Sequence, residues 1–345
     1  MAYPNFESAD FLTGHIETIL AFYEPNVRDP KGGFFHHFKD DGTIYDTDTR
    51  HLVSSTRFVF NYVNAYQQTG RPHYRDWAAH GFNYLKSHHL HPNGHYIWQH
   101  KKGVIEDGRA MAYGHAFVML AASYAARLNI DGAAQTLSSI WDFMEAYFWE
   151  AEHHAYADER DESLSVLSNY RGQNANMHSL EALIAAYETS GDARYLDRAE
   201  ELAKNFCITL AGQAAGQIWE HYTENWQPDW NYNIDKPDDL FKPWGFQPGH
   251  QVEWAKLLLQ LDALAPQNWY LPAACTLFDT AMEKGWDPLY GGLVYGYGPD
   301  GQFADAHKYF WVQAEALAAA WRLWKRTKEP IYREHYHRLW QWSWD

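Results

Sequence analysis

Eleven stretches of this chain place apolar residues three and four positions apart, which is the period of an α-helix with one buried face. They are residues 8–23, 54–70, 74–88, 114–129, 134–149, 176–191, 195–210, 249–264, 272–286, 310–326 and 332–345. The pattern therefore predicts a mainly α-helical protein.

A polar group recurs at or near the start of every second helix. Arg57, His115, His178, His250 and the segment 311–315 follow one another at intervals of about 60 to 70 residues. Each interval holds one further, more amphipathic helix, so the repeating unit is a helical hairpin. Such hairpins stack as an open solenoid or close into a ring of about six units.

The apolar helices at 114–129 and 176–191 favour the ring, because helices that are apolar on all sides have to be buried. We expect an all-α fold, an (α/α)6 toroid forming a single catalytic domain over residues 1–345. Residues 29–46 and 287–305 share Asp-Pro, Gly-Gly, aromatic residues and Asp-Gly. They are predicted to be two copies of one short β-hairpin loop at the mouth of the ring.

Charge and cysteine content limit the partners. The formal net charge is −16 and no run of Lys or Arg occurs, which argues against nucleic acid or an anionic membrane as a partner. Two distant cysteines, no basic or apolar leader and no long apolar stretch favour a cytoplasmic protein. We expect a monomer or small homo-oligomer.

Aromatic residues make up 17% of the chain, and many lie among polar residues, as in 218–233 and 293–298. Aromatic rings with a polar tip stack on sugar faces while hydrogen-bonding the hydroxyls, although single tryptophans more often fill a core. Their concentration in expected loops favours a monosaccharide substrate.

The recurring polar residues suggest acid–base chemistry. His178 with Glu181, and His250 with Glu253, are three positions apart and share a helix face, so each pair is expected to hydrogen-bond locally. A histidine beside a carboxylate can exchange protons near neutral pH. The alternative is that each histidine is a capping or core residue satisfied by its glutamate. Arg57 is either a structural ion-pair partner or the group that holds a developing enediolate oxygen.

Other chemistries have little support. The histidine-rich segment 87–100 lies in an expected loop, without the helical His-Glu-x-x-His spacing or a cysteine partner, so we expect no metal site. Dinucleotide, phosphate-loop and nucleophile-elbow motifs are absent from the sequence.

Five segments together resemble the N-acylglucosamine 2-epimerase superfamily, and most closely its aldose–ketose isomerase branch of mannose and sulfoquinovose isomerases. They are RHLVSSTRF (50–58), YGHAFVMLAASYA (113–125), GQNANMHSLEALIAAYE (172–188), GFQPGHQVEWAKLLL (245–259) and FWVQAEALAAAW (310–321). The resemblance runs over nearly the whole chain. It implies an (α/α)6 barrel and cofactor-free, metal-free proton transfer that converts mannose to fructose through a cis-enediolate.

The resemblance also assigns roles to residues. His250 is one member of the acid–base pair, Glu253 orients it, and Arg57 steadies the enediolate oxygens. His178 lies beside the ring-opening oxygen or the substrate hydroxyls. The residues expected to bind substrate are Tyr113, Asn174, Trp311 and Gln313.

One departure from the family concerns the end of the sequence. The family has a twelfth helix with a second catalytic histidine, whereas this sequence reaches Asp345 in its eleventh helix. Either the barrel lacks its closing helix or the sequence continues. A sugar 2-epimerase and a non-catalytic sugar-binding protein therefore remain alternatives. A glycoside hydrolase or lyase is disfavoured because the recurring positions carry mostly histidine and arginine rather than two carboxylates.

The charge of the substrate can also be predicted. The lack of a basic cluster beyond Arg57 favours neutral mannose over negatively charged sulfoquinovose.

Overall fold

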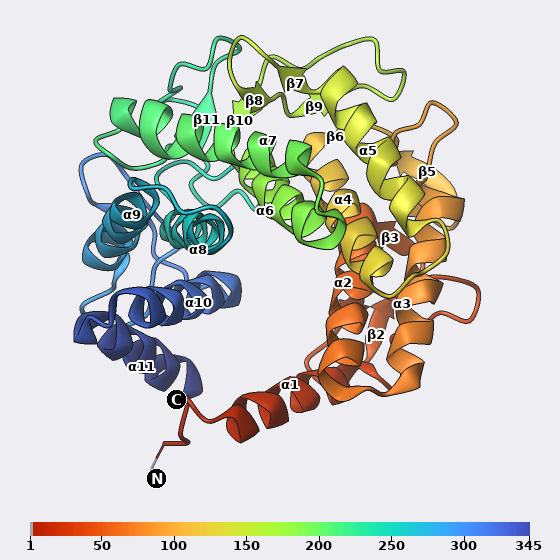
Figure 1. The fold of residues 1–345 in the computed structure, drawn as a ribbon, viewed down its shortest axis with the longest axis horizontal. Coiled ribbons are helices and arrows are strands. Elements are labelled where there is room, and N and C mark those ends of the chain that lie inside the picture. Colours follow the sequence, from red (N-terminus) through yellow and green to blue (C-terminus); the bar gives the residue numbers. More distant parts are fainter. Residues whose placement is uncertain (1–2) are drawn as a thin grey trace. The chain divides into compact units, whose positions relative to one another are not determined.

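A computed structural model describes residues 3–345, and helices dominate it, as the sequence predicts (Figure 1). All eleven expected helices are present in this range. They are α1 (Ala9–Tyr23), α2 (Leu52–Thr69), α3 (Pro72–Tyr84), α4 (Ala112–Arg127), α5 (Ala133–Tyr147), α6 (Gln173–Ser190), α7 (Ala193–Lys204), α8 (Pro248–Leu264), α9 (Tyr270–Gly285), α10 (Phe310–Thr327) and α11 (Pro330–Trp344).

The chain divides into two compact units. The N-terminal unit comprises Glu7–Asn169 and His178–Ala199, and the C-terminal unit comprises residues up to Phe6, Tyr170–Met177 and Glu200–Asp345. Helices α6 and α7 each contribute residues to both units. The expectation of a single domain over residues 1–345 stays a prediction.

Helical hairpins organise each unit. In the N-terminal unit α2 packs against α3 and α4 packs against α5, while α2 and α4 also pack against each other (Figure 1). In the C-terminal unit the pairs are α8 with α9 and α10 with α11, and α8 also packs against α10. Both α4 and α8 are buried along almost their whole length. The sequence of α4 is accordingly apolar on nearly every face, whereas α8 also buries polar side chains, which are His250, Gln251, Glu253, Lys256 and Asp262.

Short strands connect the helices. The sheets pair β1 (His37–Phe38) with β2 (Ile44–Asp46), β3 (Thr49–His51) with β4 (Gln99–Lys101) and β5 (Val104–Asp107), β6 (Ala110–Met111) with β9 (Glu159–Arg160), β7 (Trp149–Glu150) with β8 (Ala155–Tyr156), β10 (Arg171–Gly172) with β11 (His221–Tyr222), and β12 (Gly296–Tyr297) with β13 (Phe303–Asp305). All these pairings are antiparallel.

The two hairpin loops expected from the sequence are copies of each other. β1 and β2 pair His37 with Asp46, while β12 and β13 pair Gly296 with Asp305, and each hairpin contains a register shift at its first pair. Each loop also has a glycine with positive φ before its first strand, at Gly33 (69°) and Gly292 (74°). The prediction of a repeated β-hairpin loop is confirmed.

Candidate active site

His250 lies in the first turn of α8, and its ring is held by a residue from a distant loop. Nδ1 of His250 is 2.9 Å from both carboxylate oxygens of Glu220, which directly precedes β11. Both side chains are almost fully buried, with 9% of the His250 and 3% of the Glu220 side chain exposed. A carboxylate at this distance accepts the Nδ1 proton and leaves Nε2 as the basic nitrogen.

Gln173, the first residue of α6, completes this arrangement. Its Nε2 donates to Glu220 Oε2 at 2.9 Å, and its Oε1 accepts the indole N–H of Trp254 at 2.7 Å. Gln173 and Trp254 are fully buried. The tryptophan therefore fixes which end of the glutamine amide faces Glu220, and two N–H donors converge on one carboxylate.

The electrostatics around His250 favour its charged form. Burial lowers the pKa of His250, but the charge and hydrogen bond of Glu220, with smaller contributions from Glu253 and Glu315, outweigh burial and raise that pKa above its ordinary value. Lys256 lies 3.6 Å from Glu253 and 2.6 Å from Glu315, so it balances part of this negative charge.

Aromatic rings line one side of His250. The Trp311 ring centroid is 5.1 Å from that of His250, and Tyr295 contacts Trp311 edge-on at 6.3 Å. Gly249 permits this packing, because a Cβ there would lie 2.4 Å from a Trp311 ring atom. Trp311, expected from the sequence to bind substrate, thus lies beside the candidate base.

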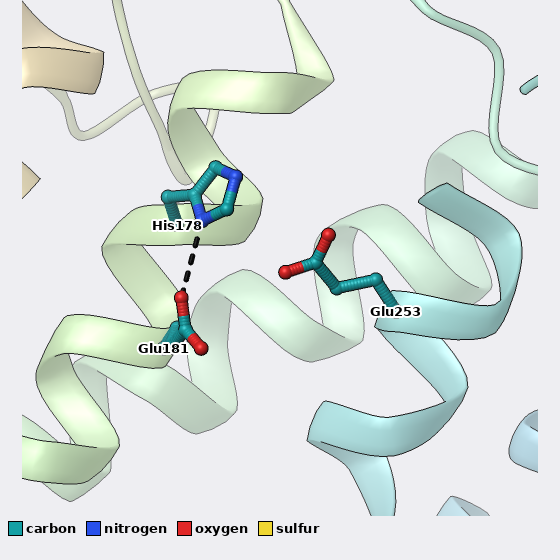
Figure 2. A group of neighbouring side chains, drawn as sticks. All are labelled: His178, Glu181 and Glu253. Carbon is teal, nitrogen blue, oxygen red and sulfur yellow. Dashed lines mark hydrogen bonds and ion pairs between the residues drawn. The ribbon is translucent and has the colours of Figure 1, made fainter. Parts of the chain in front are cut away.

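A second polar group lies in the N-terminal unit, on α6. His178 Nδ1 is 3.2 Å from a carboxylate oxygen of Glu181 one turn away, as the three-residue spacing predicts (Figure 2). The His178 ring contacts Tyr113 edge-on at 5.1 Å and Phe117 at 4.7 Å. The local hydrogen bond predicted for this pair is confirmed.

Arg57 on α2 is exposed, and its guanidinium lies 4.7 Å from the centroid of the Phe117 ring. Within the described residues 3–345, Arg57 makes no ion pair with a carboxylate, so the structural ion-pair alternative is wrong for that range. Because Phe117 also contacts His178, Arg57, Phe117 and His178 form one contiguous group within the unit.

Glu253 does not hydrogen-bond to His250 as predicted. Nδ1 of His250 has its described partners in Glu220 and Gln173, while Glu253 faces Lys256 one turn along α8. The carboxylate that orients His250 is therefore Glu220. Little in the sequence indicates this partner, since Glu220 is a single charge just before β11, thirty residues before the histidine.

The side chain of Gln313 is hydrogen-bonded to the backbone. Its amide accepts from Leu293 N–H at 3.0 Å and donates to Leu293 C=O at 2.8 Å, and it is buried. Gln251 makes the same two contacts with Ile218. Both ends of the amide thus already anchor a connecting loop, which disfavours the prediction that Gln313 binds substrate.

His115 is a core residue. Nδ1 donates to Met111 C=O at 2.7 Å and Nε2 accepts from Tyr96 N–H at 3.0 Å. Full burial lowers the pKa of His115 to about 3, so the ring stays neutral at physiological pH. Of the alternatives left open for the recurring histidines, the core role applies to this one.

Asn174 remains available for binding. It is half-buried next to Gln173, and its Oδ1 has no hydrogen-bond partner among residues 3–345. The expectations of no metal and no cofactor stay predictions.

Comparison with known proteins fixes the family. The model of the N-acylglucosamine 2-epimerase (GlcNAc 2-epimerase) family matches residues 33–345. The chain belongs to this family. A D-mannose isomerase of Marinomonas mediterranea is 51% identical over all of this chain and 88% of its own length.

Solved structures agree with this assignment to the N-acylglucosamine 2-epimerase family. A crystal structure of D-mannose isomerase, 51% identical, superposes with a TM-score of 0.98 over 99% of this chain and 88% of that one. A cellobiose 2-epimerase from Bacillus thermoamylovorans, 18% identical, shares the fold with a TM-score of 0.84 over 96% of this chain and 87% of its own. The prediction of an all-α fold of the (α/α)6 class is confirmed.

Proposed function

We propose that this chain is an aldose–ketose isomerase that interconverts D-mannose and D-fructose. The observation that carries the proposal is the 51% identity to a D-mannose isomerase over the whole chain. The buried His250–Glu220 pair supports it, because the reaction needs a base whose pKa lies near the working pH.

The reaction is a proton shift on the open-chain sugar. His250 Nε2 takes the hydrogen of C2 as a proton, and the electron pair of that bond forms the C1–C2 double bond while the C1 carbonyl oxygen becomes an enediolate oxygen. Return of the same proton to C1, and transfer of the O2 hydrogen to O1, gives the ketose. No electrons leave the sugar, so the step calls for no redox cofactor.

The other residues take supporting roles in this proposal. Arg57, an exposed cation without an ion pair among the described residues, stabilises the enediolate oxygens. His178, held by Glu181, assists ring opening. Glu253 contributes negative charge that raises the pKa of His250. Tyr113, Asn174 and Trp311 contact the sugar.

We further propose that the chain acts in the cytoplasm, as one catalytic domain and as a monomer or small homo-oligomer, with no nucleic-acid or membrane partner. The net charge of −16 and the free cysteines Cys207 and Cys275 support this. No described helix is both long and apolar enough to cross a membrane.

The test is product analysis. The purified chain is incubated with D-mannose and the sugars are followed by NMR, with His250→Ala as the inactive variant and Glu224→Gln, an exposed change in the loop after β11, as the control. We expect fructose from the unaltered chain and the control but not from His250→Ala. Glucose without fructose would instead identify a 2-epimerase, and no change in the sugar would contradict both.

A further inference from the structure

We propose that Glu220 is the positioning residue of His250, and that Gln173 and Trp254 hold Glu220 in place. This inference deepens the proposed function and rests on it for its catalytic meaning. It assigns the histidine's partner to a connecting loop before β11 rather than to the histidine's own helix.

The donors and acceptors allow one consistent arrangement. Trp254 Nε1 carries only a donor, so the Gln173 atom 2.7 Å away is the amide oxygen, and the amide nitrogen faces Glu220. His250 Nδ1 lies 2.9 Å from both Glu220 oxygens, where an unprotonated nitrogen would repel the carboxylate. Nδ1 therefore carries the proton.

The shared carboxylate of Glu220 also brings two donor nitrogens close together. Gln173 Nε2 is also 2.8 Å from His250 Nδ1. Because the Gln173 N–H groups and the Nδ1–H all donate, the approach is held by their shared acceptor, Glu220. A neutral group in place of Glu220 would leave these buried donors competing for one oxygen.

The consequence is a fixed tautomer. With its proton on Nδ1, His250 presents Nε2 as a lone-pair acceptor, and no residue among 3–345 hydrogen-bonds to Nε2. A base that must remove a carbon-bound proton needs this form, and the buried carboxylate also stabilises the imidazolium that results.

Other charges around His250 modify its titration. Glu253 and Glu315 raise the pKa of His250 to a smaller extent than Glu220, and Lys256 pairs with both. Neither Glu253 nor Glu315 hydrogen-bonds to the ring in the described structure. They supply charge without fixing the tautomer, and Glu220 does both.

The experiment measures the pKa of His250 directly, by NMR titration of its ring in the full chain carrying labelled histidine, with His250→Asn to assign the signal. The variants are Glu220→Gln, which removes the charge, and Glu224→Gln, which removes an exposed charge four residues further along the chain, after β11. We expect the His250 pKa to fall in Glu220→Gln, because burial then lowers this pKa without the opposing negative charge of Glu220. We expect it to stay unchanged in Glu224→Gln.

Turnover of mannose is measured on the same samples. We expect kcat of Glu220→Gln to fall by roughly 10²- to 10⁴-fold, with KM little changed and the acid limb of the pH–rate profile moved to lower pH. An unchanged His250 pKa with an unchanged acid limb would overturn the inference. If the unaltered chain makes no fructose, the proposed function fails, while the NMR comparison still decides whether Glu220 positions His250.

A second variant keeps the inference testable if Glu220→Gln does not fold. Trp254→Phe keeps a buried ring stacked on Phe206 but removes the N–H that orients Gln173. We expect a smaller fall in the His250 pKa and in kcat, in the same direction. If Glu220→Gln does not fold, an unchanged His250 pKa in Trp254→Phe would overturn the inference.

Discussion

At the scale of single residues, the structure separates histidines that the sequence treats alike. His115, His178 and His250 all lie in the first two turns of their helices. His115 nevertheless bonds only to backbone groups, His178 to its helical neighbour Glu181 and His250 to the distant Glu220. The i, i+3 spacing was sufficient to predict the second partner. It could not predict the third, because Glu220 reaches His250 through tertiary packing rather than through helix geometry.

Arg57 offers the sharpest test of a residue's role. Arg57→Met keeps an aliphatic stem over Phe117 and removes the charge. Since Arg57 is exposed and makes no ion pair in the described chain, we expect the melting temperature to stay unchanged while kcat falls by roughly 10²-fold or more.

Steady-state kinetics with mannose and thermal denaturation measure these two effects. Arg322→Met, an exposed change on α10, is the control and should alter neither. A lower melting temperature with unchanged kcat would mean that Arg57 serves stability rather than catalysis.

At the scale of helices and loops, the sequence predicted the elements better than the directions of their side chains. All eleven helices and both copies of the hairpin loop follow from periodicity and turn residues. The place of Gln313 at the start of α10 does not reveal that its amide turns to Leu293. Similarly, Gln173 begins α6, but only packing brings it to Glu220 and Trp254.

The two glutamine anchors predict a loss of stability. Gln313→Ala leaves the buried N–H and C=O of Leu293 without their partner, and we expect a cost of about 1–3 kcal/mol in the free energy of unfolding, with KM for mannose unchanged. Urea denaturation and steady-state kinetics measure these quantities.

Gln251→Ala should cost a similar amount, because Gln251 makes the equivalent pair of bonds to Ile218. The exposed Gln302→Ala is the control. A raised KM without a loss of stability in Gln313→Ala would restore its role in substrate binding.

At the scale of the whole molecule, buried neutral histidines set the response to acid. Burial lowers the pKa of His89 and of His115 to about 3 and that of His51 to about 4. In the unfolded chain these rings titrate near 6.5, so below that pH the unfolded state binds more protons than the folded one. Stability is therefore greatest above pH 6.5 and declines as the pH falls toward 3.

The expected slope is steep. Each of these histidines contributes up to about 1.4 kcal/mol of destabilisation per pH unit below 6.5. His250, whose pKa is raised, is protonated in both the folded and the unfolded chain well below 6.5, so its stabilising contribution is constant there and is lost only as the pH rises above 6.5. Urea denaturation between pH 7.5 and about 5 measures the effect, and His115→Gln should make the slope shallower. Stability that is constant over this range would contradict the burial of these rings as neutral groups.

The central claim is that His250 carries the sugar's C2 hydrogen to C1, and deuterium transfer tests it most directly. D-mannose labelled with deuterium at C2 is incubated with the chain in ordinary water, and the fructose formed is analysed at C1 by NMR and mass spectrometry. We predict that part of the fructose carries deuterium at C1, that turnover is slower than with unlabelled mannose, and that His250→Asn forms no fructose. Fructose formed by His250→Asn at the rate of the unaltered chain would contradict the account.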